Sequence, residues 1–326
     1  MLQAYTRVRN LSKTGPLLKA FEALVIQSTI GSPKEITPVP EVDLSAGTIE
    51  YEDTGGNGPV VVFTHGLLMD SFLWRNVIAG LQPAYRCVAP TLPLGAHRRP
   101  MHPDADLSLR GQVRLIEEFL ERLDLRDVTL VFNDWGGPLV LVSEGRAGRI
   151  ARLVPCSCEA FDNYPPGLPG RMVQLTAKLP GGLNAALQPL RLRPLRRLPI
   201  VLGWMSKRPV PDDVVGAWLR PALTHGAIRR DLQKYLDTAR RSDFIDATKG
   251  ISAFDRPVLV VWATEDRVMP PEHGRRLAEA FPRGRLAEIA DSYTLIPEDQ
   301  PGELVRVLRE FLAAETPAPA QASQHA

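Results

Sequence analysis

The hydrophobic positions of this chain fall into two patterns that alternate from about residue 46 to residue 160. Continuous apolar runs occupy residues 59–66, 85–92, 128–134 and 150–158, which is typical of strands buried on both faces of a parallel sheet. Residues 47–53 alternate like a strand with one buried face. Leu109, Val113, Ile116, Leu120 and Leu123 recur at steps of three and four, which predicts an amphipathic helix. Strands separated by helices predict right-handed crossovers and a mostly parallel sheet.

This rhythm stops between residues 162 and 250. That stretch carries helical patches, many prolines and many arginines, but no convincing strand. Buried-strand patterns return at residues 255–266 and 285–292, and a closing amphipathic helix follows at residues 304–312. We therefore predict an α/β fold with an inserted helical cap over the carboxyl edge of the sheet, where ligands bind in open α/β sheets.

Five segments follow from these patterns. We expect an N-terminal helical extension and linker at residues 1–45, the first part of the core at 46–161, the helical cap at 162–250, the second part of the core at 251–313 and a disordered tail at 314–326. The extension shows an apolar helical face at residues 17–25. We expect it to dock on the core, the alternatives being a weak membrane-surface contact or a dimer contact. The proline-bearing stretch after it predicts an extended linker.

Charge and length narrow the classes of partner. Lys and Arg number 39 against 37 Asp and Glu, a formal net charge of +2. This balance argues against nucleic acid as the main partner, because phosphate binding requires a strongly basic face. No apolar run approaches the ~20 residues of a membrane span. A small-molecule substrate and no integral membrane association are therefore expected, and the oligomeric state stays open.

The cysteines bear on the compartment. The chain has three, Cys87, Cys156 and Cys158, too few and oddly numbered for a disulfide framework. They show no zinc spacing, and the first residues lack the order of a signal peptide. We expect a cytoplasmic protein without a metal site or a cofactor.

One strand–turn–helix segment, VTLVFNDWGGPLV at residues 128–140, is the context that a nucleophile elbow requires. Its tip is Asp134, and Gly136 and Gly137 let the helix pack close to the strand. The simpler alternative is a helix cap. A carboxylate at this tip can attack an sp³ carbon, displacing halide or opening an epoxide, and leaves an alkyl ester that water must then cleave.

Three further motifs accompany this turn: THG at residues 64–66, ATEDRVMP at 263–270 and DSYTLIPEDQP at 291–301. In order and spacing they resemble the haloalkane dehalogenase and epoxide hydrolase branch of the α/β-hydrolases, over residues 48–160 and 252–313. The resemblance implies the α/β-hydrolase fold, with Asp134 as the nucleophile and Asp266 as the acid.

The same resemblance implies an oxyanion or halide site. The turn of His65 and Gly66 would place the backbone N–H of Leu67 beside that of Trp135, and the indole N–H of Trp135 could also reach a halide. His65 itself is expected to support the turn rather than to transfer protons. Glu159, just after a strand, is an alternative acid, because some haloalkane dehalogenases have their acid at that place.

One departure matters most. The terminal loop aligns without gaps, and this alignment places Thr294 where the family has its catalytic histidine. That histidine activates the water that hydrolyses the ester, and losing a general base costs ~10²–10⁴ in rate. His97 lies in a loop near the same edge and is a candidate replacement, although a loop-packing role is the expected one.

Three smaller features of the chain also bear on function. Leu67 stands where one dehalogenase group has a halide-binding asparagine, while Trp204 or Trp218 in the cap could supply a second indole N–H. Tyr235 is the one tyrosine expected deep in the cap as an acid for epoxide opening. A basic cluster of Arg191, Arg193, Arg196, Arg197, Lys207 and Arg208 indicates a solvated helix face or, alternatively, an anionic substrate or carrier at the cap entrance.

Three functions remain open. The first is an enzyme of hydrolase ancestry that acts on a small apolar substrate through Asp134. The second is a non-hydrolytic lyase, isomerase or cyclase that uses the Asp134 carboxylate without an ester intermediate, which the missing histidine favours. The third is a catalytically silent protein that binds a ligand in the pocket. Fold alone does not decide among them.

Overall fold

A computed structural model of the chain describes residues 39–314. Its centre is an eight-stranded sheet with the order β1-β2-β4-β3-β5-β6-β7-β8. β1 pairs with β2 and β2 with β4 in antiparallel fashion, and every other neighbouring pair is parallel. The predicted mostly parallel sheet is therefore confirmed. The strands are β1 (Glu41–Leu44), β2 (Gly47–Asp53), β3 (Val60–Thr64), β4 (Arg86–Pro90), β5 (Val128–Asp134), β6 (Ile150–Cys158), β7 (Val258–Ala263) and β8 (Gly284–Ile289).

The continuous apolar runs form the middle of this sheet. Every residue of β5 is buried, and its Val131 pairs in register with Phe63 of β3 and Val154 of β6. Helices cover both faces of these strands, so both sets of alternating side chains face a core and the sequence shows no polar alternation.

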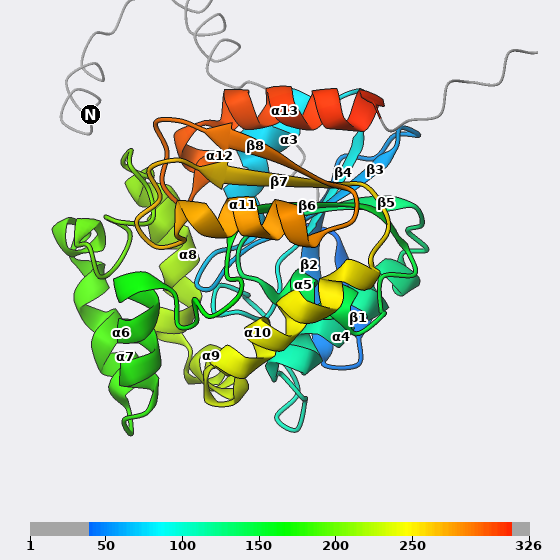
Figure 1. Ribbon diagram of the computed structural model, residues 1–326. Coiled ribbons are helices and arrows are strands. Elements are labelled where there is room, and N and C mark those ends of the chain that lie inside the picture. The colour runs from blue at the N-terminus through cyan, green and yellow to red at the C-terminus, as the bar shows by residue number, and fades with distance from the viewer. Residues whose placement is uncertain (1–38, 315–326) are drawn as a thin grey trace, which may run out of the picture. The chain divides into compact units, whose positions relative to one another are not determined.

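The flanking helices form two layers (Figure 1). Helices α3 (Arg75–Leu81) and α13 (Pro301–Ala314) pack together on one face, while α4 (Leu109–Arg122), α5 (Gly137–Ser143), α10 (Arg241–Gly250) and α11 (Pro271–Ala280) cover the other. The predicted stripe on α4 is buried, with Val113, Ile116 and Leu120 among its inward residues. The remaining short elements of the core are η1 (Ser71–Trp74) and α12 (Ile296–Asp299).

The chain between β6 and β7 contains helices and no strand among the described residues. Its helices are α6 (Gly167–Ala177), α7 (Gly182–Leu187), η2 (Gln188–Arg191), η3 (Arg193–Arg197), α8 (Asp212–Thr224), α9 (Gly226–Thr238), α10 and η4 (Ile251–Ala253). Helices α6 to α9 lie beyond the carboxyl ends of the strands (Figure 1), whereas α10 packs against α5 beside the sheet. The exact boundaries of a cap, 162 and 250, stay a prediction.

One part of the expected N-terminal linker is wrong. Residues 41–44 form β1, the edge strand of the sheet, because Leu44 and Ala46 bury their side chains and the backbone pairs with β2 across a two-residue turn. The helix expected around residues 17–25 and the tail at 315–326 lie outside the described residues. Within residues 39–314, no helix combines the length and apolar character needed to cross a membrane.

Candidate active site

The turn after β5 brings Asp134 to the tip of a sharp bend. Asp134 has φ +68°, in the left-handed region, and the N–H of Trp135 donates to the carbonyl of Asn133 at 2.8 Å. Such a conformation costs of order 1–3 kcal/mol for a residue other than glycine, although aspartate tolerates it better than most. Helix α5 begins three residues later at Gly137. The bend therefore has the backbone geometry expected of a nucleophile elbow.

The turn of His65 and Gly66, after β3, lies against this carboxyl group. A Cβ on Gly66 would lie 2.0 Å from Oδ2 of Asp134, so only glycine leaves room for the side chain. The N–H of Leu67 donates to the Asp134 carboxyl group. These two close approaches fix the position of the carboxylate.

His65 holds this turn through both ring nitrogens. Its Nε2 accepts the N–H of Leu92 at 2.9 Å, which places the ring proton on Nδ1, the atom that contacts the carbonyl of Gly66 at 2.8 Å. Burial lowers the pKa of His65 to about 4, so the ring is neutral at pH 7. With both nitrogens engaged by the backbone, His65 supports the turn and has no free nitrogen for proton transfer.

Three buried carboxyl groups surround the elbow. Burial, followed by the charge of Asp266, raises the pKa of Asp134 to about 7. Burial and then the charge of Asp134 raise the pKa of Glu159 well above its usual range, although the N–H of Gly136 donates to its Oε2 at 3.3 Å. Burial thus favours the protonated form of Glu159, while a pKa of about 7 divides Asp134 between its two forms at neutral pH.

Asp266 lies in the loop after β7, where burial raises its pKa to about 6. Its Oδ1 accepts the N–H groups of Val268 and Met269 at 2.9 and 2.8 Å, and the hydroxyl of Thr294 donates to the same oxygen at 2.7 Å. Its Oδ2 is buried and has no hydrogen-bond partner among the described residues. The structure thus places the Thr294 hydroxyl against Oδ1 of Asp266. Within residues 39–314, the other oxygen, Oδ2, stays free to accept a hydrogen bond.

The terminal loop that carries Thr294 is fixed by buried polar contacts. The amide of Asn133 donates to the carbonyl of Thr294 at 2.8 Å, which ties the loop to the elbow strand. Asp299 accepts the N–H groups of Tyr293, Lys207 and Arg208 at 2.8–2.9 Å. These contacts fix the backbone of the loop and the position of the Thr294 side chain beside Asp266.

His97 does not fill that gap. It is buried, and its Nε2 lies 3.2 Å from Asp231 of α9, whose carboxylate also accepts the N–H of Met101. The ring thus joins the loop after β4 to α9. His273 lies on α11, with its ring edge-on to Phe161. Neither histidine lines the cavity described below.

The N–H groups expected to hold a leaving anion are already engaged. The Leu67 N–H contacts Asp134, and the Trp135 N–H contacts Asn133. The indole N–H of Trp135 donates to the hydroxyl of Tyr235 at 3.0 Å, and that of Trp218 donates to Asp70 at 2.9 Å. A halide site of two free indole groups is therefore not formed by Trp135 and Trp218.

Tyr164 is a further residue of the site, which no sequence motif indicated. This residue follows β6 by six positions and lines the cavity beside Glu159, while its hydroxyl is hydrogen-bonded to that of Tyr235. Burial raises the pKa of both phenols, so both remain proton donors. Its place shortly after a strand that ends at the ligand-binding edge was the signal that could have identified it.

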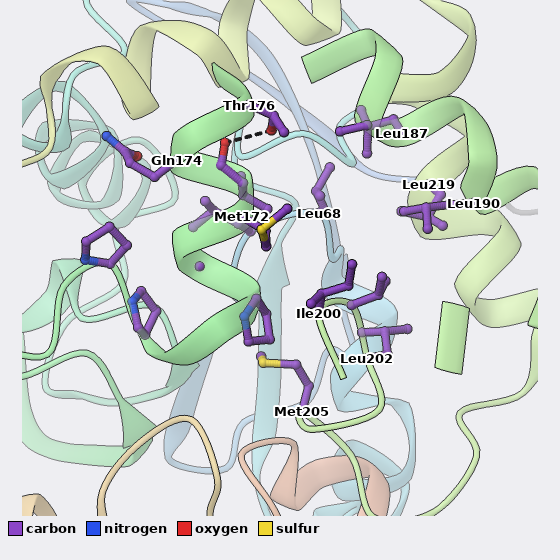
Figure 2. Close-up of a pocket in the computed structure, with 18 of the residues that line it drawn as sticks. Leu68, Met172, Gln174, Thr176, Leu187, Leu190, Ile200, Leu202, Met205 and Leu219 are labelled. Carbon is purple, nitrogen blue, oxygen red and sulfur yellow. Dashed lines mark hydrogen bonds between the residues drawn. The ribbon is translucent and has the colours of Figure 1, made fainter. Parts of the chain in front are cut away.

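Asp134, Glu159 and Tyr164 line an apolar cavity of about 400 Å³. Leu67, Asp134 and Glu159 form its inner end, and side chains from α6, α7 and the following loops form its walls. Figure 2 shows Met172 and Thr176 of α6 on one side, with Ile200, Leu202 and Met205 across from them. Asp134 and Glu159 are the only acidic or basic residues that line the cavity among those described, so the cavity suits a mainly apolar ligand that reacts at one end.

Comparison with known proteins agrees with this geometry. Residues 59–301 match the family of the alpha/beta hydrolase fold. This chain belongs to that family. Its relatives place it in the haloalkane dehalogenase-like branch.

Two relatives and one solved structure cover most of this α/β-hydrolase. Haloalkane dehalogenase 2 of Mycobacterium tuberculosis is 27% identical over 302 residues, which span 85% of this chain and 98% of the relative. The cis-3-alkyl-4-alkyloxetan-2-one decarboxylase of Xanthomonas campestris is 25% identical over 86% of this chain and 96% of its own length. The crystal structure of haloalkane dehalogenase DbeA from Bradyrhizobium elkani matches 85% of this chain and 97% of its own, with a TM-score of 0.68 at 19% identity.

Proposed function

We propose that this α/β-hydrolase is an enzyme in which Asp134 attacks an sp³ carbon of a small, mainly apolar substrate and forms an alkyl ester. The observation that carries the proposal is the position of the Asp134 carboxyl group. It lies at the tip of a strained elbow, against Gly66 and the Leu67 N–H, and at the inner end of an apolar cavity. A carboxylate held in this way attacks carbon bound to a leaving group.

The second step of an ordinary hydrolase lacks support in this chain. The Thr294 hydroxyl donates a hydrogen bond to Asp266, and a hydroxyl does not accept a proton from water at neutral pH. A missing general base costs ~10²–10⁴ in rate. We therefore expect the ester on Asp134 to accumulate, unless the bound substrate part reacts further and frees Asp134.

The segment between β6 and β7 closes the cavity in this proposal. Residues 162–250 would act as the cap, since α6 and α7 contribute cavity walls and Tyr164 contributes a phenol. Glu159 is the acid nearest to the reacting end, and its raised pKa suits it to protonate a leaving oxygen rather than to orient a base.

The direct test is intact-protein mass spectrometry after incubation with alkyl halides and with alkyl epoxides. The expected result is a stable mass gain that peptide mapping assigns to Asp134. The variant Asp134→Asn is the matched control, because it keeps the shape of the side chain and an acceptor for the Leu67 N–H, and it should gain no mass. An equal gain in both proteins would overturn the assignment of Asp134. Absence of adduct and product, with saturable ligand binding, would instead support a silent binding protein.

A second candidate is a lyase that opens a strained β-lactone, and two observations favour it. The relative from Xanthomonas campestris is named as a decarboxylase of alkyl-substituted oxetanones. Moreover, the N–H groups that would hold a free halide are engaged, whereas ring strain reduces the need to stabilise a departing ion.

The lactone reaction balances without water or a base. The Asp134 carboxylate bonds to the sp³ ring carbon next to the ring oxygen, not to the carbonyl carbon. The bond between this sp³ carbon and the ring oxygen breaks, which leaves a carboxylate on the opened substrate. The bond between that carboxylate and its α-carbon then breaks to release CO₂. Its electron pair forms the alkene and expels Asp134, whose carboxylate is regenerated.

Product analysis separates the two candidates. Incubation with a dialkyl β-lactone in ¹⁸O-labelled water should yield alkene and CO₂, with no hydroxy acid and no label on Asp134. A labelled hydroxy acid would show hydrolysis instead and would reject the lyase. The first candidate would survive that result if the label entered through an ester on Asp134.

A further inference from the structure

Large apolar side chains are exposed in one part of this molecule. Among residues 39–314, eight such side chains are exposed, and six of them lie between residues 168 and 200. Leu175 is 56% exposed and Leu192 is 63% exposed. Isolated exposed leucines are ordinary, but a contiguous stretch of them marks an interaction site. The six are Leu168, Leu175, Leu179, Leu192, Leu198 and Ile200.

Helix α6 is apolar on two faces. Its inner face contributes Met172, Val173 and Thr176 to the cavity wall. Its outer face carries Leu168 and Leu175, seven residues apart and therefore on one side of the helix, and Leu179 continues the row just beyond the helix end. The exposed leucines share this outer side with Arg171 and Lys178, and leucines grouped in this way mark an interaction site.

The charges around these leucines are mainly basic, although Asp212 forms an exposed ion pair with Arg193 at 3.8 Å. Residues 163–211 contain eight Lys or Arg and no Asp or Glu, although the whole chain carries a net charge of only +2. Arg171 and Lys178 lie on the outer side of α6, and Arg193 and Arg197 are exposed beside Leu192 and Leu198. Leucine interleaved with Lys and Arg is the composition of segments that lie on anionic lipid surfaces.

The structure divides the basic cluster noted in the sequence. Arg196 is buried, and its guanidinium donates to the carbonyls of Leu190 and Asp212, which is a structural role. Lys207 and Arg208 form ion pairs with Glu265 and Asp291. The remaining exposed cations, Arg191, Arg193 and Arg197, stay on the same segment as the exposed leucines.

This surface is continuous with the cavity. Leu198 and Ile200 both line the cavity and are exposed, so the cavity reaches the outside at these residues. Figure 2 shows Ile200 across the cavity from Met172 of α6. An apolar substrate that partitions into lipid would enter the cavity at this point without crossing water.

We propose that the basic apolar face, formed by the outer side of α6 with Leu179 and by residues 191–200, docks on the surface of an anionic phospholipid bilayer and opens the cavity towards it. The contact is peripheral. The leucines enter the boundary between headgroups and acyl chains, and the arginines and lysines approach the lipid phosphates. This inference is independent of the reaction at Asp134.

Vesicle flotation with the full chain tests the proposal. Vesicles of phosphatidylcholine mixed with phosphatidylglycerol should carry the protein to the top of the gradient, and vesicles of phosphatidylcholine alone should carry much less. Raising the salt concentration should weaken the association, because the Debye length shortens from about 10 Å at 0.1 M to about 3 Å at 1 M. Equal binding to both kinds of vesicle, or binding to neither, would overturn the proposal.

Paired variants locate the surface. Arg193→Gln with Arg197→Gln should weaken binding to the anionic vesicles about 25-fold, from about fivefold for each cation. Leu175→Gln with Leu179→Gln should weaken it at least as much, and neither pair removes a buried contact. Matched controls are Lys249→Gln and Phe72→Gln, which remove an exposed cation and an exposed ring elsewhere on the chain, and these should bind like the original protein.

The variant results decide between lipid and other occupants. If the patch variants and the controls bind vesicles alike, the surface assignment is wrong. If the patch variants instead abolish a dimer seen by sedimentation, and no variant changes flotation, the face is an interface between copies of this chain and the lipid proposal fails.

Discussion

The two halves of the candidate active site differ in how complete they are. On the nucleophile side, Asp134 is strained into position, Gly66 leaves room for it and the Leu67 N–H contacts it. On the other side, Asp266 accepts two backbone N–H groups and the hydroxyl of Thr294, and in our proposal Thr294 stands where a hydrolase would have its base. Backbone contacts hold both carboxyl groups in place, whereas the chemistry of a base would depend on the one side chain at position 294.

The strongest way to break this comparison is to restore the base with Thr294→His. The buried Oδ2 of Asp266 has no partner among the described residues and could accept an imidazole N–H. We expect hydrolysis of an ester on Asp134 to accelerate by ~10²–10⁴, so that a single mass gain gives way to repeated turnover. Mass spectrometry of samples quenched at successive times measures the decay of the adduct, and the amount of product released measures the number of turnovers.

Thr294→Val is the matched control for that replacement. It keeps the branched shape but removes the donor to Asp266, so it should destabilise the protein by about 1–3 kcal/mol and create no turnover. If the folded histidine variant hydrolyses the ester no faster than the valine variant, the terminal loop does not present position 294 to the ester.

A smaller effect is expected on the nucleophile side from Gly66→Ala. The new Cβ would lie 2.0 Å from Oδ2 of Asp134, so the carboxylate must move, and a displacement of about 1 Å costs about 100-fold in rate. The rate of adduct formation measures the loss. Gly302→Ala, in α13, is the control, because its Cβ would meet no atom within 4 Å. Equal rates for both variants would mean that the elbow tolerates a shifted carboxylate.

The fold and the elbow were predictable because their signals are local. Continuous apolar runs identified β3, β5 and β6, and the pattern around residues 128–140 identified the turn at Asp134. Tyr164 was missed, and the engagement of Trp135 by Tyr235 was not foreseen, because these contacts join residues up to 100 positions apart. The strand β1 was mistaken for a linker because four residues directly after a proline-bearing stretch carry too little pattern to show pairing with β2.

The pH dependence of adduct formation sharpens the comparison further. Only the Asp134 carboxylate is nucleophilic, and its pKa is raised to about 7, so the rate should rise about tenfold per pH unit below pH 7 and level off above it. Asp266→Asn removes a charge that raises this pKa. The inflection should therefore move to lower pH, with a rate increase of several-fold at pH 6. An unmoved inflection would mean that the two carboxyl groups do not interact.

The smallest expected effect is on stability, where Asp134→Asn should help the protein more as the pH rises. The pKa of Asp134 is raised from 3.8 to about 7 in the folded chain, so folding favours the protonated form. The stability that this proton contributes is fully present below pH 4 and is lost as the pH rises through 7. Asparagine has no such proton to lose, so the melting temperature of the variant relative to the original protein should increase by a few degrees from pH 4 to pH 8. Scanning calorimetry measures that difference, and a difference that stays constant with pH would show that Asp134 is ionised at little cost in the folded state. The turn would then hold the Asp134 carboxylate without the loss of stability that burial implies. Asp134 and the Asp266–Thr294 pair would then differ in the reaction that each can support, and not in what each costs the folded protein.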